Sequence, residues 1–278
     1  MTTPAFLTAE WRSLVMYNVP VDKALLAPLV PTGTELDLWC GEALVSLVGF
    51  RFLKTRLKGV PIPFHQNFDE VNLRFYVRRR VGHEWRRGVV FIKEVVALPA
   101  VSWVARSIYH ENYVTRRMRH YLQYPAETSN SLGRFEYAWQ DHGAWLTLAA
   151  DVSGPLTNLS PETDADFILE HYWGYTSQPD GSTYEYAVEH PRWRIWPDVR
   201  VTFTGDATRL YGAEFAAALK QSPHSVIASE GSAVVVRKGM PLRRDPTSRD
   251  SRDELPYRSV DDVPPLRKRP QGCEVIND

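Results

Sequence analysis

The chain has 278 residues, 44% of them hydrophobic and 24% charged, a composition typical of a globular protein that can bury a sizeable core. Its 33 Lys and Arg residues balance 33 Asp and Glu residues, so no net charge steers the protein toward nucleic acid or an anionic membrane. No stretch resembles a membrane-spanning helix or a secretory signal. The sequence predicts a cytoplasmic protein without nucleic-acid or membrane partners, with Cys40 and Cys273 as reduced thiols.

The first half of the chain is rich in short runs that are typical of strands and hairpins. We expect a helix capped by Asp22, a hairpin, a second antiparallel strand pair, and then one or two helices where apolar residues recur at helical spacing. In chain order these elements span Val21–Pro31, Leu36–Cys40, Glu42–Phe52, Glu70–Val77, Gly88–Val95 and Leu98–Leu122.

The second half repeats this β character and ends in a proline-rich, charged tail. Its expected elements are a hairpin, a helix, two strands, a short helix and a last strand; they span 133–139, 144–152, 164–172, 183–190, 198–204, 213–220 and 232–237. Many strands without βαβ alternation predict an α+β, β-rich barrel or folded sheet with a few short helices. We expect one barrel domain over residues 1–240 and an extended tail over 241–278.

The strand Glu70–Val77 alternates strictly between polar and apolar side chains. Glu70, Asn72 and Arg74 project to one face, and Val71 and Leu73 to the other. Composition alone favours a sheet with its polar face in water. The alternative is that the polar face lines a pocket.

Several runs in a fixed order resemble the YqjF-like family of uncharacterised conserved proteins. They are Val30–Asp37, Phe68–Val77, Arg87–Phe91, Ala105–Arg106, Tyr109–Tyr113, Met118 and Tyr186–Trp193, within a match from Trp11 to Arg237. This family is similar in fold to acetoacetate decarboxylase. The resemblance therefore implies a closed antiparallel β-barrel with an interior pocket, in agreement with the many strands expected above.

The decarboxylase uses a lysine that forms a Schiff base with its ketone substrate, and the resemblance implies that this chain lacks it. Arg106 matches an arginine of the decarboxylase pattern, and Glu70 matches its pocket glutamate. Where the pattern has a proline followed by two lysines, this chain has Asn112–Val114, and no lysine occurs between Lys93 and Lys220. Schiff-base decarboxylation is therefore not expected. Lys93 is a remote alternative nucleophile, although a lysine in such a strand more often reaches the surface.

A second polar cluster includes His110, Glu111, Tyr113 and Arg116, which together offer a base, an acid and an anion-binding group. A solvated helix end explains the same residues equally well. The eight histidines show no metal-ligand spacing, and no nucleotide-binding motif is present, so we expect no metal and no cofactor.

These observations lead to a hypothesis about function. The barrel binds a small organic molecule with a carboxylate or carbonyl group, through Asn72, Arg74, Arg106, Tyr113 and Arg116, with Glu70, His110 and Glu111 as candidate catalytic groups. A non-catalytic binding or structural module is the alternative. The sequence decides neither this question nor whether the barrel assembles into a homo-oligomer.

Overall fold

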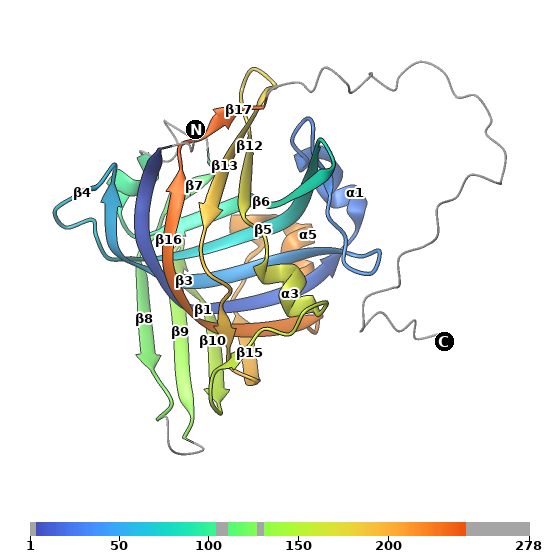
Figure 1. Ribbon diagram of the computed structural model, residues 1–278. Coiled ribbons are helices and arrows are strands. Elements are labelled where there is room, and N and C mark those ends of the chain that lie inside the picture. Colours follow the sequence, from blue (N-terminus) through green and yellow to red (C-terminus); the bar gives the residue numbers. More distant parts are fainter. Residues whose placement is uncertain (1–3, 104–110, 127–130, 243–278) are drawn as a thin grey trace, which may run out of the picture.

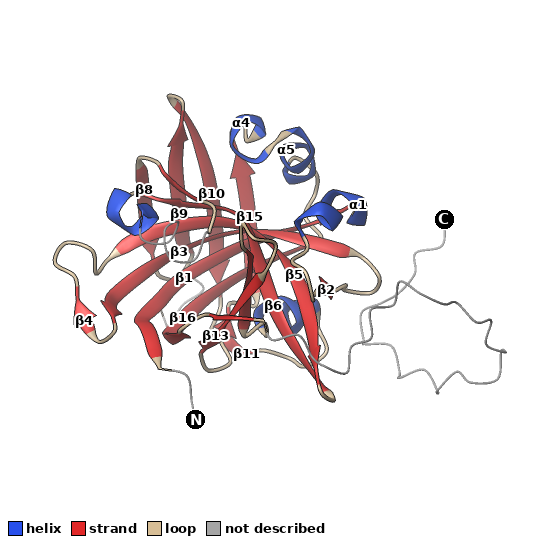
Figure 2. Ribbon diagram, turned by 90° about the horizontal axis from the view of Figure 1, so that it is seen from above, coloured by secondary structure: helices blue, strands red, loops and turns tan. Residues whose placement is uncertain are grey.

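The computed structural model describes residues 4–103, 111–126 and 131–242, and most of them lie in strands (Figure 1). The strands are β1 Ala5–Val21, β2 Glu35–Leu36, β3 Ala43–Leu57, β4 Val60–Pro61, β5 Phe68–Val81, β6 Glu84–Val96, β7 Tyr113–Thr115, β8 Met118–Gln123, β9 Gly133–Asp141, β10 Ala144–Ser153, β11 Thr157–Asn158, β12 Trp173–Ser177, β13 Thr183–Glu189, β14 Arg194–Ile195, β15 Asp198–Thr204, β16 Ser225–Arg237 and β17 Met240–Pro241. The helices are α1 Lys23–Leu26, which continues as a 3₁₀ turn Ala27–Leu29, α3 Asp164–Leu169, α4 Thr208–Tyr211 and α5 Ala213–Leu219. Figure 2 shows α4 and α5 beside one another at the rim of the strands.

The strand pairings form a circuit that returns to its starting point. Its order is β16, β1, β3, β5, β6, β12 and β13, and β13 pairs again with β16 through Val188–Val236 and Glu189–Val235. Most pairs are antiparallel, as expected, but β6 pairs in parallel with both β12 and β7. The chain is thus a β-rich barrel with few short helices, and not an entirely antiparallel one.

A second sheet, β15-β10-β9-β8, packs against the outside of this circuit and extends below it in Figure 1. The layer between the two contains the apolar face of β5, including Leu73 and Phe75, together with Tyr137 and Trp139 of β9. All four side chains are fully buried. The interior of the circuit has a separate apolar cluster, in which Phe167 of α3 packs among barrel residues. Both faces of the central strands are therefore covered.

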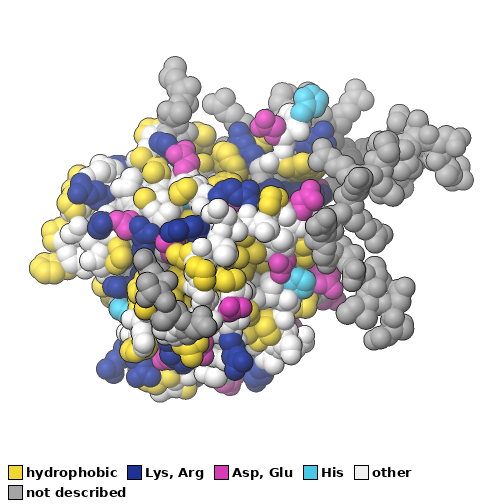
Figure 3. Space-filling model, turned by 60° about the horizontal axis from the view of Figure 1, so that its bottom comes forward, with side chains coloured by type: hydrophobic (Ala, Val, Ile, Leu, Met, Phe, Trp, Pro, Cys, Tyr) yellow, Lys and Arg dark blue, Asp and Glu magenta, His cyan; other side chains and the backbone are white. Residues whose placement is uncertain are grey.

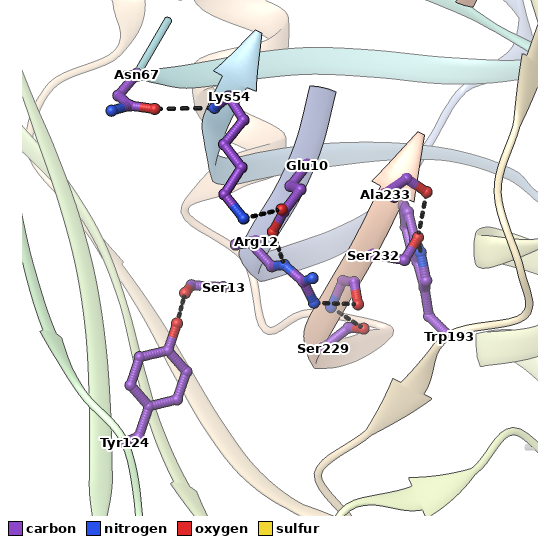
Figure 4. A network of polar contacts seen from close by, with 11 residues as sticks. Glu10, Arg12, Ser13, Lys54, Asn67, Tyr124, Trp193, Ser229, Ser232 and Ala233 are labelled. Atoms are coloured by element: carbon purple, nitrogen blue, oxygen red, sulfur yellow. Dashed lines mark hydrogen bonds and ion pairs between the residues drawn. The ribbon is translucent and has the colours of Figure 1, made fainter. Parts of the chain in front are cut away.

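A polar network links β1 to its neighbours β3 and β16 (Figure 4). Glu10 accepts hydrogen bonds from Lys54 of β3 at 2.6 Å and from Arg12 at 3.0 Å, and Arg12 also donates to the carbonyl of Gly231 in β16. Tyr124, which follows β8, contacts the hydroxyl of Ser13.

On the face shown in Figure 3, Lys and Arg side chains form a band beside hydrophobic ones. The balanced charge of the chain is thus locally uneven.

Several expected elements agree with the structure and others do not. Asp22 caps α1 by accepting from the backbone N–H of Ala24 at 2.8 Å. The hairpin expected between 36–40 and 42–52 is wrong, because Trp39 and Glu42 form only an isolated bridge and β3 pairs with β1 and β5. The long strand β1 was not expected from the sequence.

The helical expectation for 98–122 is correct only at its start. Residues 99–103 are helical, but β7 and β8 occupy 113–115 and 118–123. The aromatic and β-branched run Tyr113–Thr115 extends along β6, and β8 pairs with β9. Strand pairing with β6 and β9 thus outweighs the helical spacing of the apolar residues in this segment.

Two further expectations concern cysteines and the tail. Cys40 is disulfide-bonded, so the expectation of a reduced thiol is wrong at this position. Residues 243–278 of the expected tail lie outside the described residues, and β17 at its start pairs with β13. Within the described part of the chain, no helix is both long and apolar enough to cross a membrane.

Candidate functional site

A cavity of about 300 Å³ lies inside the barrel circuit. Each of the seven circuit strands contributes to its wall, for example through Leu7, Phe50, Glu70, Glu94, Trp173, Tyr186 and Val236. Most of the wall is apolar or aromatic, and its polar members are Thr55, His65, Glu70, Asn72, Arg74, Glu94, Glu111 and His171, with the hydroxyls of Tyr113 and Tyr186. An apolar wall with a few polar groups is typical of a small-molecule site.

The polar face of β5 lines this cavity. Glu70, Asn72 and Arg74 point into it, whereas Leu73 and Phe75 pack against the second sheet. Glu70 and Asn72 are only 2% and 1% exposed, so a polar face in contact with water is the wrong interpretation of the alternation.

Glu94 of β6 faces the same cavity and was not identified from the sequence. Up to Phe91 the odd-numbered residues of β6 point inward, but the β5–β6 register shifts between Leu73 and Arg74 and leaves Ile92 as an extra residue. This bulge reverses the alternation, so that Glu94 and not Lys93 enters the cavity. Lys93 instead donates to Asn112 at 3.0 Å on the outside.

Two of the three glutamates belong to separate hydrogen-bonded groups, each of which includes a tyrosine. Glu70 accepts from Asn72 at 3.0 Å and from Tyr113 at 2.9 Å. Glu111 accepts from Thr176 at 2.6 Å and from Tyr186 at 3.0 Å. Residues from β5, β7, β12 and β13 thus hold two carboxyl groups in fixed positions.

Burial raises the pKa of each of these glutamates. The pKa values of Glu70 and Glu111 rise to about 7, although hydrogen bonds from Asn72 and Thr176 partly oppose the loss of solvation. The pKa of Glu94 lies well above its usual range, because burial is reinforced by the charges of Glu111 and Glu70. At neutral pH the cluster therefore holds protons that exposed glutamates would have lost.

His171 and Arg74 lie in the wall of the same cavity. His171 Nε2 lies 3.2 Å from Asp37, which also accepts from Arg87 at 2.6 Å. Burial lowers the pKa of His171 to about 4, so its ring is neutral, and its Nε2 proton is directed to the Asp37 carboxylate. The guanidinium of Arg74 lies 5.9 Å from the centre of the Tyr76 ring.

Unpaired polar atoms concentrate on this wall. Nine buried side-chain nitrogen and oxygen atoms among the described residues have no hydrogen-bond partner. Six of them belong to lining residues: Trp11, Thr55, Asn72, Arg74, Glu94 and His171. Buried polar groups normally have hydrogen-bond partners. Most of the exceptions among the described residues therefore lie on the wall of this cavity.

The structure brings together five of the eight residues proposed from the sequence: Glu70, Asn72, Arg74, Glu111 and Tyr113. Arg116 does not line the cavity and pairs with Asp141 at 2.9 Å. Arg106 and His110 lie outside the described residues. Glu94 and His171 were missed, since a bulge positions the first and neither belongs to a recognisable motif. The described residues contain no group of three or more His, Cys, Asp or Glu side chains arranged to hold a metal ion.

The chain is similar in fold to proteins of the acetoacetate decarboxylase type. Acetoacetate decarboxylase from Legionella pneumophila superimposes with a TM-score of 0.60 at 13% identity, covering 87% of this chain and 90% of that one. The enduracididine biosynthesis enzyme MppR in complex with pyruvate gives 0.58 at 15% identity, covering 87% and 92%. An acetoacetate decarboxylase-like enzyme from Sphingomonas wittichii gives 0.58 at 12% identity, covering 87% and 94%. These identities establish the fold alone.

Sequence comparison gives the family. The uncharacterized protein YqjF of Bacillus subtilis is 27% identical over 182 residues, which cover 65% of this chain and 72% of that protein. The model of the family DUF2071, described as an uncharacterized conserved protein, matches residues 8–233. The chain therefore belongs to the DUF2071 family and has an acetoacetate decarboxylase-like fold.

Proposed function

We propose that the barrel binds a small organic molecule, with a carbonyl or carboxylate group held near Arg74 and an apolar part against the aromatic wall. The observation that carries this proposal is the concentration of unpaired buried polar atoms on the cavity wall. Arg74 Nε is one of them, while Nη2 of the same guanidinium makes only a long contact of 3.9 Å with Met16 Sδ, and an unpaired guanidinium N–H is suited to an oxygen of a ligand. Tyr113 and Asn72 hold Glu70 in the wall of the same cavity.

We further propose that binding is non-covalent and involves no Schiff base. An imine needs an uncharged amine next to the substrate carbonyl. The described wall residues include no lysine, and Lys93 donates to Asn112 on the other side of β6. Without a lysine in the described wall, the chain is not expected to form the Schiff base on which acetoacetate decarboxylase depends.

Native mass spectrometry of the purified protein, before and after mild denaturation, tests the binding proposal. We expect a bound organic molecule at one copy per chain, or one-to-one binding of a small keto acid or carboxylic acid from a panel. A Val48→Trp variant fills the cavity and should lose this binding, while Glu136→Gln, on β9 outside the cavity, should retain it. Equal binding by the Val48→Trp variant would contradict the proposal.

Borohydride treatment in the presence of pyruvate or acetoacetate tests the second part. We expect no increase in protein mass, because no lysine amine faces the ligand. A reduced adduct on Lys93 or on any other lysine would overturn the non-covalent proposal.

A second candidate function is proton transfer at a carbon next to a carbonyl group. The observation that favours it is that two carboxyl groups with pKa values of about 7, Glu70 and Glu111, share a cavity with the more strongly protonated Glu94. A carboxylate would accept the carbon-bound proton, and a protonated glutamate would transfer its proton to the carbonyl oxygen, giving an enol. Carboxyl groups poised near neutral pH suit both roles.

Exchange of the methyl protons of pyruvate in D₂O, followed by NMR, distinguishes an enzyme from a binding module. An enzyme accelerates exchange, and Glu70→Gln should reduce the rate by about 100-fold or more while binding persists. Binding without any acceleration would favour the non-catalytic module.

A further inference from the structure

We propose that Asn72 and Glu94 form a binding site for a protonated nitrogen, so that the ligand of this cavity is an organic ammonium compound with an apolar part. This inference rests on the proposed binding function and specifies the ligand class. It concerns a second polar group of the ligand, in addition to the oxygen assigned to Arg74.

The register of the barrel places the two residues side by side. Asn72 of β5 is the direct cross-strand partner of Glu94 of β6, and both side chains point into the cavity. The Cβ atoms of such pairs lie roughly 5 Å apart. Asn72 Oδ1 and Glu94 Oε2 are both buried and have no hydrogen-bond partner. Two adjacent acceptors in this arrangement fit a group with several N–H donors.

The orientation of the Asn72 amide follows from its neighbour. Its Nδ2 donates to Glu70 Oε1 at 3.0 Å, which leaves Oδ1 as the free atom. The opposite orientation would bring an oxygen against the Glu70 carboxylate. Glu70 therefore fixes Asn72 as an acceptor toward the cavity.

The wall contains more carboxyl groups than cations, and a bound cation would favour the charged form of these carboxyl groups. Three glutamates line the cavity with a single arginine and no lysine among the described residues. Aromatic side chains, including Phe91 and Trp173, make up much of the rest of the wall, and aromatic faces attract organic cations. The described residues offer no metal-type cluster of carboxylates. An ammonium group satisfies these conditions better than a metal ion or an anion.

A bound cation would also change the protonation of Glu94. Without it, burial and the neighbouring Glu111 and Glu70 raise the pKa of Glu94 well above its usual range. An ammonium group beside the carboxyl would favour the charged form, so binding should release a proton. A carbonyl ligand would instead accept a hydrogen bond from the protonated carboxyl and release none.

Three probes of equal chain length separate these cases: hexylamine, hexan-1-ol and hexanoate, titrated in phosphate buffer and followed by ligand-detected NMR. We expect hexylamine to bind about tenfold or more tightly than hexan-1-ol. Its affinity should rise between pH 6 and 8, because Glu94 and the neighbouring Glu70 and Glu111 lose protons more readily as the pH rises. The affinity of hexan-1-ol should not change with pH.

The variant Glu94→Gln, which keeps the size of the side chain, should lower hexylamine affinity by about tenfold or more and leave hexan-1-ol unaffected. It should also weaken the pH dependence of hexylamine binding, of which Glu70 and Glu111 supply the remainder. Asn72→Val provides a second test by removing the other acceptor, and Glu136→Gln on β9 is the matched control. Equal affinities for the three probes, or unchanged hexylamine binding by both variants, would overturn the ammonium inference.

The same titrations distinguish failure of the inference from failure of the proposed function. If hexanoate or hexan-1-ol binds and hexylamine is not preferred, the ammonium-binding site is contradicted but the proposed binding function is not. If none of the three probes binds and Val48→Trp has no effect on any ligand, both proposals are overturned.

Discussion

Replacing Glu70 by Gln should make the protein more resistant to a rise in pH. The pKa of Glu70 is raised from 4.5 to about 7, mainly by burial, so the folded state retains a proton that the unfolded state has lost within this window. The free energy of unfolding therefore falls as the pH rises from about 4.5 through 7. At about 1.36 kcal/mol per pKa unit, Glu70 accounts for roughly 3 kcal/mol of this loss, and Gln cannot ionise. Gln can still accept from Asn72 and donate to the Tyr113 hydroxyl.

Urea-induced unfolding of the wild type and of Glu70→Gln at pH 5, 6, 7 and 8 measures this effect. His171 contributes a slope of opposite sign below pH 6.5, because burial lowers its pKa to about 4, but both proteins share it. The difference in unfolding free energy between variant and wild type should therefore grow with pH in favour of the variant. A difference that stays constant from pH 5 to 8, as expected for the control Glu136→Gln, would refute the assignment of Glu70 as a buried, proton-holding carboxyl.

Three further substitutions test other parts of the barrel. Arg87→Ala removes the cation that pairs with Asp37 and opposes protonation of His171, so NMR titration should show the His171 pKa rising from about 4; an unchanged value would exclude this electrostatic coupling. Ser46→Ala removes the hydroxyl that donates to Asn18 at 2.6 Å in a buried network, and chemical denaturation should show a loss of about 1–3 kcal/mol. Gly174→Ala would bring a Cβ atom to 2.1 Å from the Tyr186 ring and displace its hydroxyl from Glu111, so thermal unfolding should occur at a lower Tm; an unchanged Tm would contradict this close packing.

The part of the site that lies on β5 could be predicted from the sequence, because strict alternation identifies the residues that share a face. Glu70, Asn72 and Arg74 do lie together. Alternation does not say what covers each face, however, and composition alone favoured a polar face exposed to water over one that lines a pocket. The second sheet decides the matter, since Tyr137 and Trp139 cover the apolar face of β5 and leave its polar face to the barrel interior.

Long-range pairing explains most of the other differences. The strand β1 interrupts its apolar residues with Ser13 and Asn18, but it is held between β3 and β16 along nearly its whole length. The segment Tyr113–Thr115 has too few residues to show a period, and its partner β6 makes it a strand. Neither partner is identifiable from the local sequence.

The bulge at Ile92 decides which side chain of β6 enters the cavity. With regular alternation from Phe91, Lys93 would point into the cavity and place an amine among Glu70, Glu111 and Tyr113. One extra residue in β6 instead turns Lys93 outward and brings a carboxyl group opposite Asn72. Whether the cavity holds a carboxyl group or an amine at this position thus depends on a local irregularity of the backbone. For this reason the ligand class that we propose rests on the register of two strands rather than on the fold, which this chain shares with acetoacetate decarboxylase.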